Sequence, residues 1–343
     1  MSSEQRHFDG FEVCMQLPPL TRGPFTITDL VKFAAATNDY SEIHFDESVA
    51  RARGLPAPVV HGPLKSALLA QMLTNWIGPA GTLKRLACQY RQMDVVGETI
   101  TCRGKVTRKS AGEGEGIIEC EVWTENSRGE ITTRGSALLS LPLRQAAGTE
   151  AARKEEGVTS DGSQASLITE QMRKDLKLGE VGGVFTYEVD RKWIRQFAAA
   201  FDDPNPMWHD EAYARKMGRF GTVIAPPTFF AALDPVETRE LLLDAWVETI
   251  PYKNSGGGNA FNEVEYFLPI RAGDTISVEV TYTDISERDG RSGRLLFRIR
   301  ENVLKNQRGE LVARARSGHV RSYDLSARIL HEGTMKNPGL TES

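Results

Sequence analysis

An internal repeat constrains the fold of this chain more than any other feature of its sequence. Residues 33–69 match residues 197–233 at a constant offset of 164 positions without a gap. The matched positions include glycine and acidic residues as well as apolar ones, a mixture that chance does not hold in register over this length. The sequence therefore predicts two copies of one fold.

Two later segments repeat at larger offsets. Residues 90–97 match 266–273 at an offset of 176, and the turn at 126–130 matches 306–310 at an offset of 180. Because the offset grows from 164 to 176, the second copy carries about 12 extra residues, which we place near 236–259.

The repeat divides the chain of 343 residues into domains. The segment between the copies begins with Ala, Glu, Gly, Ser and Lys in no apolar period, which is typical of a flexible tether. We predict four parts: an N-terminal domain over 1–144, a linker over 145–180, a C-terminal domain over 181–325 and a tail over 326–343.

Each copy changes from helical to strand-like spacing of apolar residues. Thr26 and Asp29 form a capping pattern before a first helix, and a longer helix is predicted to begin at Gly62. Alternating segments then predict four strands in the first copy: 86–93, 99–107, 116–124 and 132–141. A long helix followed by antiparallel strands predicts an α+β architecture.

Composition excludes several classes of protein. Lys and Arg number 42 against 46 Asp and Glu, a formal net charge of −4, which excludes a strongly basic nucleic-acid-binding protein. The sequence has no run of eighteen apolar residues, so we expect no membrane span and a cytoplasmic location. Its cysteines and histidines lack the spacing of a zinc site, so we expect no metal.

One constellation of polar residues stands out in the first copy. Asp39 is followed five residues later by His44, and the pair His61-Gly62 opens the predicted long helix. This pattern resembles the MaoC-like, or (R)-specific enoyl-CoA hydratase, family of hot-dog folds, although Ser41-Glu42 stands where the family usually has Asn-Pro. The resemblance implies a double hot-dog, in which each copy wraps an antiparallel β-sheet around a long central helix.

The resemblance also implies a reaction, the addition or removal of water at a 2-enoyl thioester. Such chemistry needs a base, an acid and a hydrogen-bond donor for the enolate-like oxygen. Asp39 and His44 would share the proton transfers by holding one water, and the N–H of Gly62 at the helix start would bind the thioester oxygen. We expect His61 to orient the helix start rather than to transfer protons.

The second copy lacks the matching groups. At the offset of 164, His44 corresponds to Trp208 and Gly62 to Pro226, which has no N–H. Asp203 is retained, and we expect it to stabilise its own loop. The N-terminal domain is thus predicted to be catalytic, and the C-terminal domain to be a degenerate copy similar to the dehydratase-like domains found beside MaoC domains.

The resulting prediction is a hydro-lyase acting on an enoyl-CoA or 3-hydroxyacyl-CoA, in fatty acid or steroid metabolism. The acyl-CoA would be substrate, with no separate cofactor, and homodimer formation stays open. Three alternatives remain: a 3-hydroxyacyl dehydratase for an acyl carrier protein, a hot-dog thioesterase, and a noncatalytic acyl-binding partner subunit. The extra segment near 236–259 would let the second domain admit a long or bulky acyl group.

Overall fold

A computed structural model gives the architecture of the chain. The described residues are 7–112, 114–143, 166–175, 177–217, 220–235, 250–290 and 293–328.

The first half contains three α-helices, two short 3-10 helices and five strands. The helices are η1 (Phe8–Gly10), α1 (Ile27–Thr37), η2 (Glu42–His44), α2 (Glu47–Ala52) and α3 (Gly62–Ile77). The strands are β1 (Leu20–Arg22), β2 (Thr82–Tyr90), β3 (Ile100–Ala111), β4 (Glu115–Glu125) and β5 (Ile131–Pro142).

The described part of the second half repeats much of this order. Its helices are α4 (Glu170–Asp175), α5 (Arg191–Ala199), η3 (Pro206–Trp208), α6 (Glu211–Met217) and η4 (Pro227–Leu233). Its strands are β6 (Val181–Glu188), β7 (Tyr252–Tyr266), β8 (Thr275–Gly290), β9 (Gly293–Lys305) and β10 (Leu311–Arg328).

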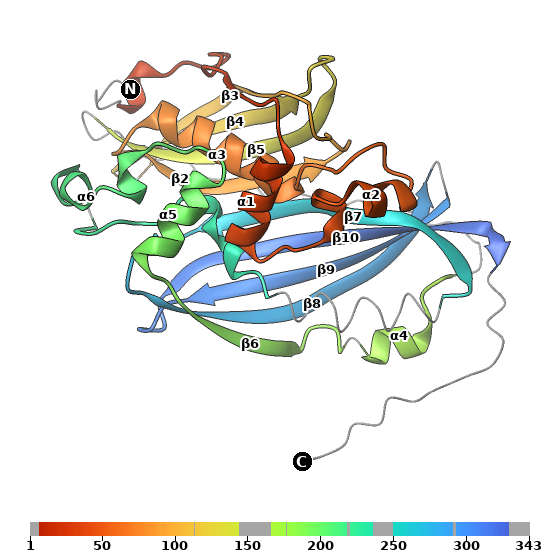
Figure 1. Cartoon of the computed structure of the whole chain (residues 1–343). Coiled ribbons are helices and arrows are strands. Elements are labelled where there is room, and N and C mark those ends of the chain that lie inside the picture. Colours follow the sequence, from red (N-terminus) through yellow and green to blue (C-terminus); the bar gives the residue numbers. More distant parts are fainter. Residues whose placement is uncertain are drawn as a thin grey trace.

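All ten strands form one antiparallel sheet (Figure 1). Their order is β1-β3-β4-β5-β2-β7-β10-β9-β8-β6. From the central pair outward, β2-β5-β4-β3-β1 of the first half corresponds strand for strand to β7-β10-β9-β8-β6 of the second. The two halves join where β2 pairs with β7, in a register from Arg85 opposite Glu265 to Gln89 opposite Phe261. This arrangement confirms the predicted double hot-dog fold.

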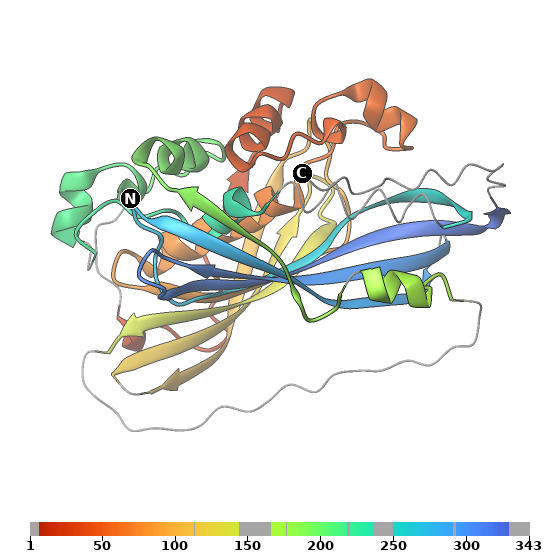
Figure 2. The same cartoon turned by 90° about the horizontal axis from the view of Figure 1, so that it is seen from below.

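Apart from the short α4, the helices gather on one face of the sheet, as the turned view shows (Figure 2). Helix α3 forms the centre of the core, because twelve of its sixteen residues are buried. Aromatic packing joins the two halves above the sheet, with the rings of Phe33 in α1 and Phe197 in α5 centred 6.1 Å apart. The helix predicted to begin at Gly62 is therefore the central helix of the first hot-dog.

The matching position in the second half differs. The described residues there form the short 3-10 helix η4, so the part of the chain that the structure describes contains a long central helix in the first half alone. The prediction of extra residues near 236–259 falls largely on residues 236–249, which lie outside the described residues. Residues 252–259 of that segment belong to β7.

Backbone hydrogen bonds correct the gapless alignment of the two copies. The N–H of Val60 donates to Asp94 O at 2.8 Å, and the N–H of Ala225 donates to Ile270 O at 2.8 Å, so the offset here is 165 rather than 164. The 3-10 helices η2 and η3 still match at 164. One extra residue in the second copy therefore separates them from the central helix, and the counterpart of Gly62 is Pro227, not Pro226.

The predicted linker, 145–180, contains ordered structure in its described part. Leu167, Ile168 and Met172 are buried in a small apolar cluster with residues of the second half, among them Tyr323. Strand β10 likewise reaches Arg328, three residues past the predicted domain end. Among the described residues, no helix has the length and apolar character needed to cross a membrane.

Candidate active site

The end of α1 places Asp39. The helix begins with the predicted capping box, in which Asp29 N–H donates to Thr26 Oγ1 and the Asp29 carboxylate accepts from the Thr26 N–H. It ends at Asn38, whose φ of 53° lies in the left-handed region that Asn tolerates. The Asp39 N–H then donates to Ala34 O at 3.0 Å, so the aspartate is held directly beyond the helix end.

His44 is held by the loop that precedes α3. It ends the 3-10 helix η2, is 8% exposed, and its Nδ1 lies 2.7 Å from Val59 O. Because a carbonyl oxygen only accepts, Nδ1 carries the proton that it donates, and Nε2 of the neutral ring carries the lone pair. The Val59 N–H in turn donates to Ile43 O at 3.0 Å, which fixes this carbonyl relative to η2.

His61 is the residue before α3 and has no exposed surface. Its side chain makes no capping hydrogen bond. Its ring instead stacks on that of His44, with centroids 3.6 Å apart and planes 19° apart, and it lies 5.2 Å from the ring of Phe33. His61 therefore contacts the candidate base directly, which the sequence pattern did not predict.

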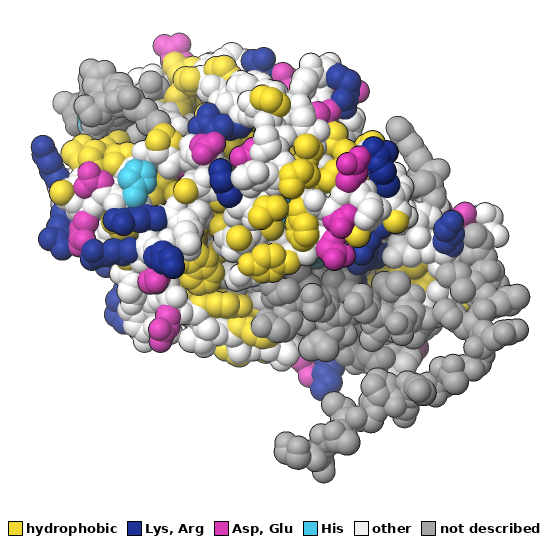
Figure 3. All heavy atoms as spheres, viewed as in Figure 1, with side chains coloured by type: hydrophobic (Ala, Val, Ile, Leu, Met, Phe, Trp, Pro, Cys, Tyr) yellow, Lys and Arg dark blue, Asp and Glu magenta, His cyan; other side chains and the backbone are white. Residues whose placement is uncertain are grey.

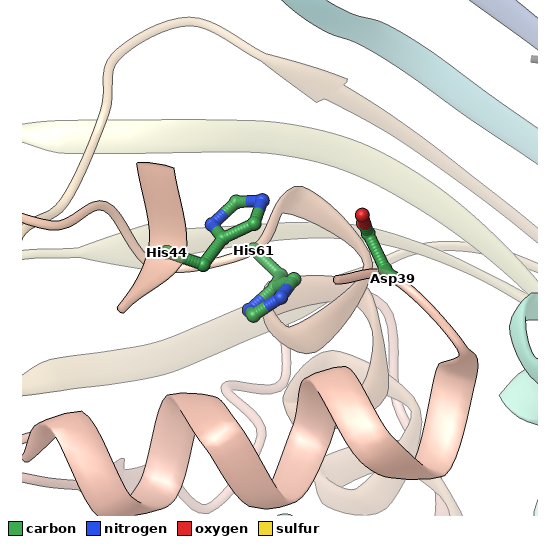
Figure 4. Close-up of side chains that lie close together, drawn as sticks. All are labelled: Asp39, His44 and His61. Atoms are coloured by element: carbon green, nitrogen blue, oxygen red, sulfur yellow. The ribbon is translucent and has the colours of Figure 1, made fainter. Parts of the chain in front are cut away.

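The three side chains form one cluster (Figure 4). One oxygen of Asp39 and one ring nitrogen each of His44 and His61 all lie within 4.8 Å of one another. These atom types also ligate divalent cations. The two rings are nearly parallel, however, so their in-plane lone pairs run side by side and do not converge on one point. The cluster therefore suits a shared water better than a metal ion.

The start of α3 lies against this cluster. The first N–H groups of an α-helix have no carbonyl partner within the helix, and Gly62 is the first helical residue. A Cβ at this position would lie 3.1 Å from the ring of Tyr90, so glycine allows the ring to pack on the helix start. The hydroxyl of Tyr90 donates to Asn262 Oδ1 at 2.8 Å and so joins the first half to the second.

A buried ion pair fixes the first turn of α3. Lys65 Nζ lies 2.8 Å from Asp94 Oδ2 and 2.9 Å from Gln92 O, and both ionised side chains have 2% or less of their surface exposed. Burial lowers the pKa of Lys65, and the carboxylate of Asp94 opposes this shift. The sequence pattern did not predict this pair, although a lysine on an otherwise apolar helix face indicates a buried partner.

The second half holds its aspartate differently. Asp203 is 5% exposed and accepts from the indole Nε1 of Trp208 at 2.8 Å and from the Asn205 N–H at 3.1 Å. Burial raises the pKa of this carboxyl, and the indole hydrogen bond opposes the rise. These contacts match the predicted loop-stabilising role, and Pro227 offers no N–H at the counterpart of Gly62.

Two family descriptions match the two halves. The description "MaoC like domain" matches residues 15–126, and "FAS1-like, dehydratase domain region" matches residues 177–315. A protein of Streptomyces griseus named UPF0336 is 33% identical over 129 residues, which are 38% of this chain and 81% of that protein. The chain belongs to the MaoC-like dehydratase family.

Two relatives of this MaoC-like protein carry functional names. The (R)-specific enoyl-CoA hydratase of Aeromonas caviae is 23% identical over 119 residues, 34% of this chain and 87% of its own length. The 3-oxo-4,17-pregnadiene-20-carboxyl-CoA hydratase beta subunit of Mycobacterium tuberculosis is 27% identical over 117 residues, 34% of this chain and 85% of its own length. The chain spans 66% of the length of another UPF0336 protein, from Thermobifida fusca.

Solved structures agree with the fold of this MaoC-like chain over nearly its whole length. A MaoC domain dehydratase from Chloroflexus aurantiacus superposes with a TM-score of 0.70 at 13% identity, covering 94% of this chain and 98% of that one. A Mycobacterium tuberculosis protein described as a double hotdog fold gives 0.60 at 14% identity, covering 92% and 98%. At these identities the likeness supports the fold alone.

Proposed function

We propose that the chain is a hydratase or dehydratase of a 2-enoyl thioester, with CoA as the carrier and with Asp39 and His44 transferring the protons. The observation that carries this proposal is the cluster of Asp39, His44 and His61 beside the start of α3. A family whose named relatives include enoyl-CoA hydratases supports the reaction class. On the face in Figure 3, basic side chains gather toward the left edge, and hydrophobic side chains are exposed across the middle.

The geometry suits the addition of one water. His44 Nε2 and the Asp39 carboxylate would hold the water between them, and the water oxygen bonds to C3 as one proton passes to this pair. The electron pair of the double bond moves toward the thioester oxygen, where the N–H of Gly62 and the dipole of α3 stabilise the negative charge. C2 then takes a proton from the pair, and dehydration follows the reverse course.

The first test removes each proton-transfer group. Asp39→Asn and His44→Ala should each lower kcat for an enoyl-CoA by at least ~10², because each removes a group from proton transfer. The measurement is the loss of enoyl-thioester absorbance by the purified full-length chain, with circular dichroism to verify folding. Near-normal turnover by both variants would show that the assignment of Asp39 and His44 as proton-transfer groups is wrong.

Matched controls lie in the second copy. Trp208→Ala and His209→Ala alter the counterpart of His44 and its neighbour, and neither should abolish turnover. Assaying free thiol in the same reactions separates the alternatives: a thioesterase releases CoA, whereas a hydratase bleaches the enoyl absorbance without releasing it. A folded chain with no activity on CoA or carrier-protein thioesters would favour a noncatalytic partner subunit.

A long or bulky acyl group is the second part of this proposal. Tyr40, directly after Asp39, has 61% of its surface exposed, and Met93, directly before Asp94, has 55% exposed. Apolar surface next to the candidate site favours an apolar substrate, and the steroid-acid name of one relative points the same way. We expect a higher kcat/KM for a long-chain or steroid-like enoyl-CoA than for crotonyl-CoA. A clear preference for the four-carbon substrate would contradict this.

A further inference from the structure

A cavity lies at the end of α3 opposite the candidate active site. Its volume is about 230 Å³, and it lies between the C-terminal turn of α3, including Thr74 and Ile77, and the second half, including Trp208 and Phe230. Asp39, His44 and His61 lie at the N-terminal end of the same helix. A helix of sixteen residues is about 24 Å long, so the cavity and the candidate active site are well separated.

The cavity is the counterpart, in the second copy, of the candidate active site. Matching hydrogen bonds establish the register here: the N–H groups of Arg91 and Phe267 donate to Thr132 O and Val312 O, respectively, each at 2.9 Å. Together with the registers given above, this pairs the second-half lining residues with residues of the first half, and in six of the pairs the first-half residue is polar or ionisable and buried. These six pairs are His44 with Trp208, His61 with Pro226, Lys65 with Phe230, Asp94 with Ile270, Thr132 with Val312, and Thr133 with Ala313.

Every one of these six pairs replaces a polar or ionisable residue with a less polar one. Random loss of a catalytic motif would not convert a buried ion pair, two threonines and two histidines together. The cavity has also stayed open. Apolar side chains of this size would pack densely and close it if nothing occupied the space between them. An apolar cavity of about 150 Å³ takes up benzene, so this cavity of 230 Å³ admits a longer apolar ligand.

We propose that this cavity is a second, noncatalytic site that binds an unbranched acyl chain. The acyl class rests on the proposed function, because the cavity is the degenerate counterpart of a thioester site. Among the described lining residues the one cation is Lys84, and its Nζ lies 3.5 Å from Glu115 Oε2. The site therefore recognises the chain by its apolar length, with the carboxyl or thioester end directed outward. The occupant is a separate molecule and not the tail of the substrate.

The test is calorimetric titration of the full-length chain with decanoate. We expect saturable binding at one site, weakened at least tenfold by Ala313→Leu, which fills the cavity from β10. Ala225→Leu fills the cavity from a different side and replaces Ala313→Leu in the test if that variant does not fold. The matched control is Thr133→Ala, at the counterpart of Ala313 in the first half, and it should leave decanoate affinity unchanged.

A competition experiment identifies the occupant. Butyryl-CoA is a saturated thioester that should occupy the candidate active site without reacting, and decanoate affinity should be the same in its presence and absence. No binding of decanoate, or equal binding by the filled variants, overturns the proposal. Competition between the two ligands also overturns it, because the chain would then occupy the substrate site. Absence of hydratase activity contradicts the proposed function and leaves the decanoate result unaffected.

Discussion

The exchange of His44 for Trp208 changes the hydrogen bonding of two matching loops. Both aromatic side chains end a 3-10 helix five residues after an aspartate. The indole can only donate, and it donates to Asp203, whereas the imidazole donates from Nδ1 to Val59 O and keeps a basic nitrogen. In the second half, the indole hydrogen bond therefore occupies the carboxylate of Asp203. In the first half, the ring of His44 can exchange a proton.

This difference predicts a pH dependence for Asp203. Burial raises its pKa above the ordinary value of 3.8, so the folded protein binds this proton more tightly than the unfolded chain does. The stability that the protonated carboxyl contributes is therefore present below 3.8 and is lost as pH rises through the folded pKa. Relative to Asp203→Asn, the wild-type free energy of unfolding should fall between pH 3.8 and neutrality. Urea titrations across this range test it, and a relative gain by the wild type would contradict it.

A residue could be found from the sequence where its partners lie close to it along the chain. Asp39, His44 and Gly62 belong to a short pattern with fixed spacing, so the sequence predicted them as a group. The stacking of His61 on His44 depends on how a loop packs against a helix start, and no local pattern encodes it. The partner of Lys65 lies 29 residues away across a tertiary contact.

The secondary-structure elements were predictable where local chemistry defines them. The capping box of α1 and the four meander strands of the first half agree with the structure to within a few residues. The one-residue shift before η4 could not be predicted, because Val59, Val60 and Pro63 align with Val223, Ile224 and Pro227 without a gap. Only the backbone hydrogen bonds reveal the shift. The order of the strands in the sheet could not be predicted from local patterns either, since β2 and β7 pair across more than 160 residues.

The buried ion pair of α3 supports a prediction at this scale. Lys65→Met should lower the free energy of unfolding by roughly 3–5 kcal/mol, because it leaves the Asp94 carboxylate buried without its counter-charge. The double variant Lys65→Phe/Asp94→Ile installs the residues that the second copy uses, Phe230 and Ile270, and should recover most of that loss. Urea unfolding measures both variants.

An exposed pair provides the comparison. Arg103 and Glu125 link β3 and β4 with 45% and 24% of their side chains exposed, so Arg103→Ala should cost less than about 1 kcal/mol. For the buried pair, the contrary result would be a double variant Lys65→Phe/Asp94→Ile that is no more stable than Lys65→Met. The ion pair itself, rather than the filling of the space, would then stabilise α3.

The whole molecule depends on the junction of its two halves. Without β7, strand β2 would present unpaired N–H and C=O groups along Arg85–Gln89, which is a template for pairing with another chain. The ring of Phe33 would also lose its contact with Phe197, and Tyr90 its bond to Asn262. A single hot-dog half is therefore incomplete, even though it contains all the candidate catalytic residues.

We accordingly predict that residues 1–144 expressed alone are insoluble or form a homodimer through β2, because self-pairing replaces the missing strand and covers the apolar face of α3. Size-exclusion chromatography with light scattering gives the mass of the half-length protein. The full-length chain run beside it reports whether the intact protein also self-associates. A half-length dimer that hydrates enoyl-CoA would indicate that the junction, and not the sequence of the second copy, supports the candidate site. A stable, fully active monomer of residues 1–144 would show that the first half needs no partner and would contradict the dependence argued from β2 and β7.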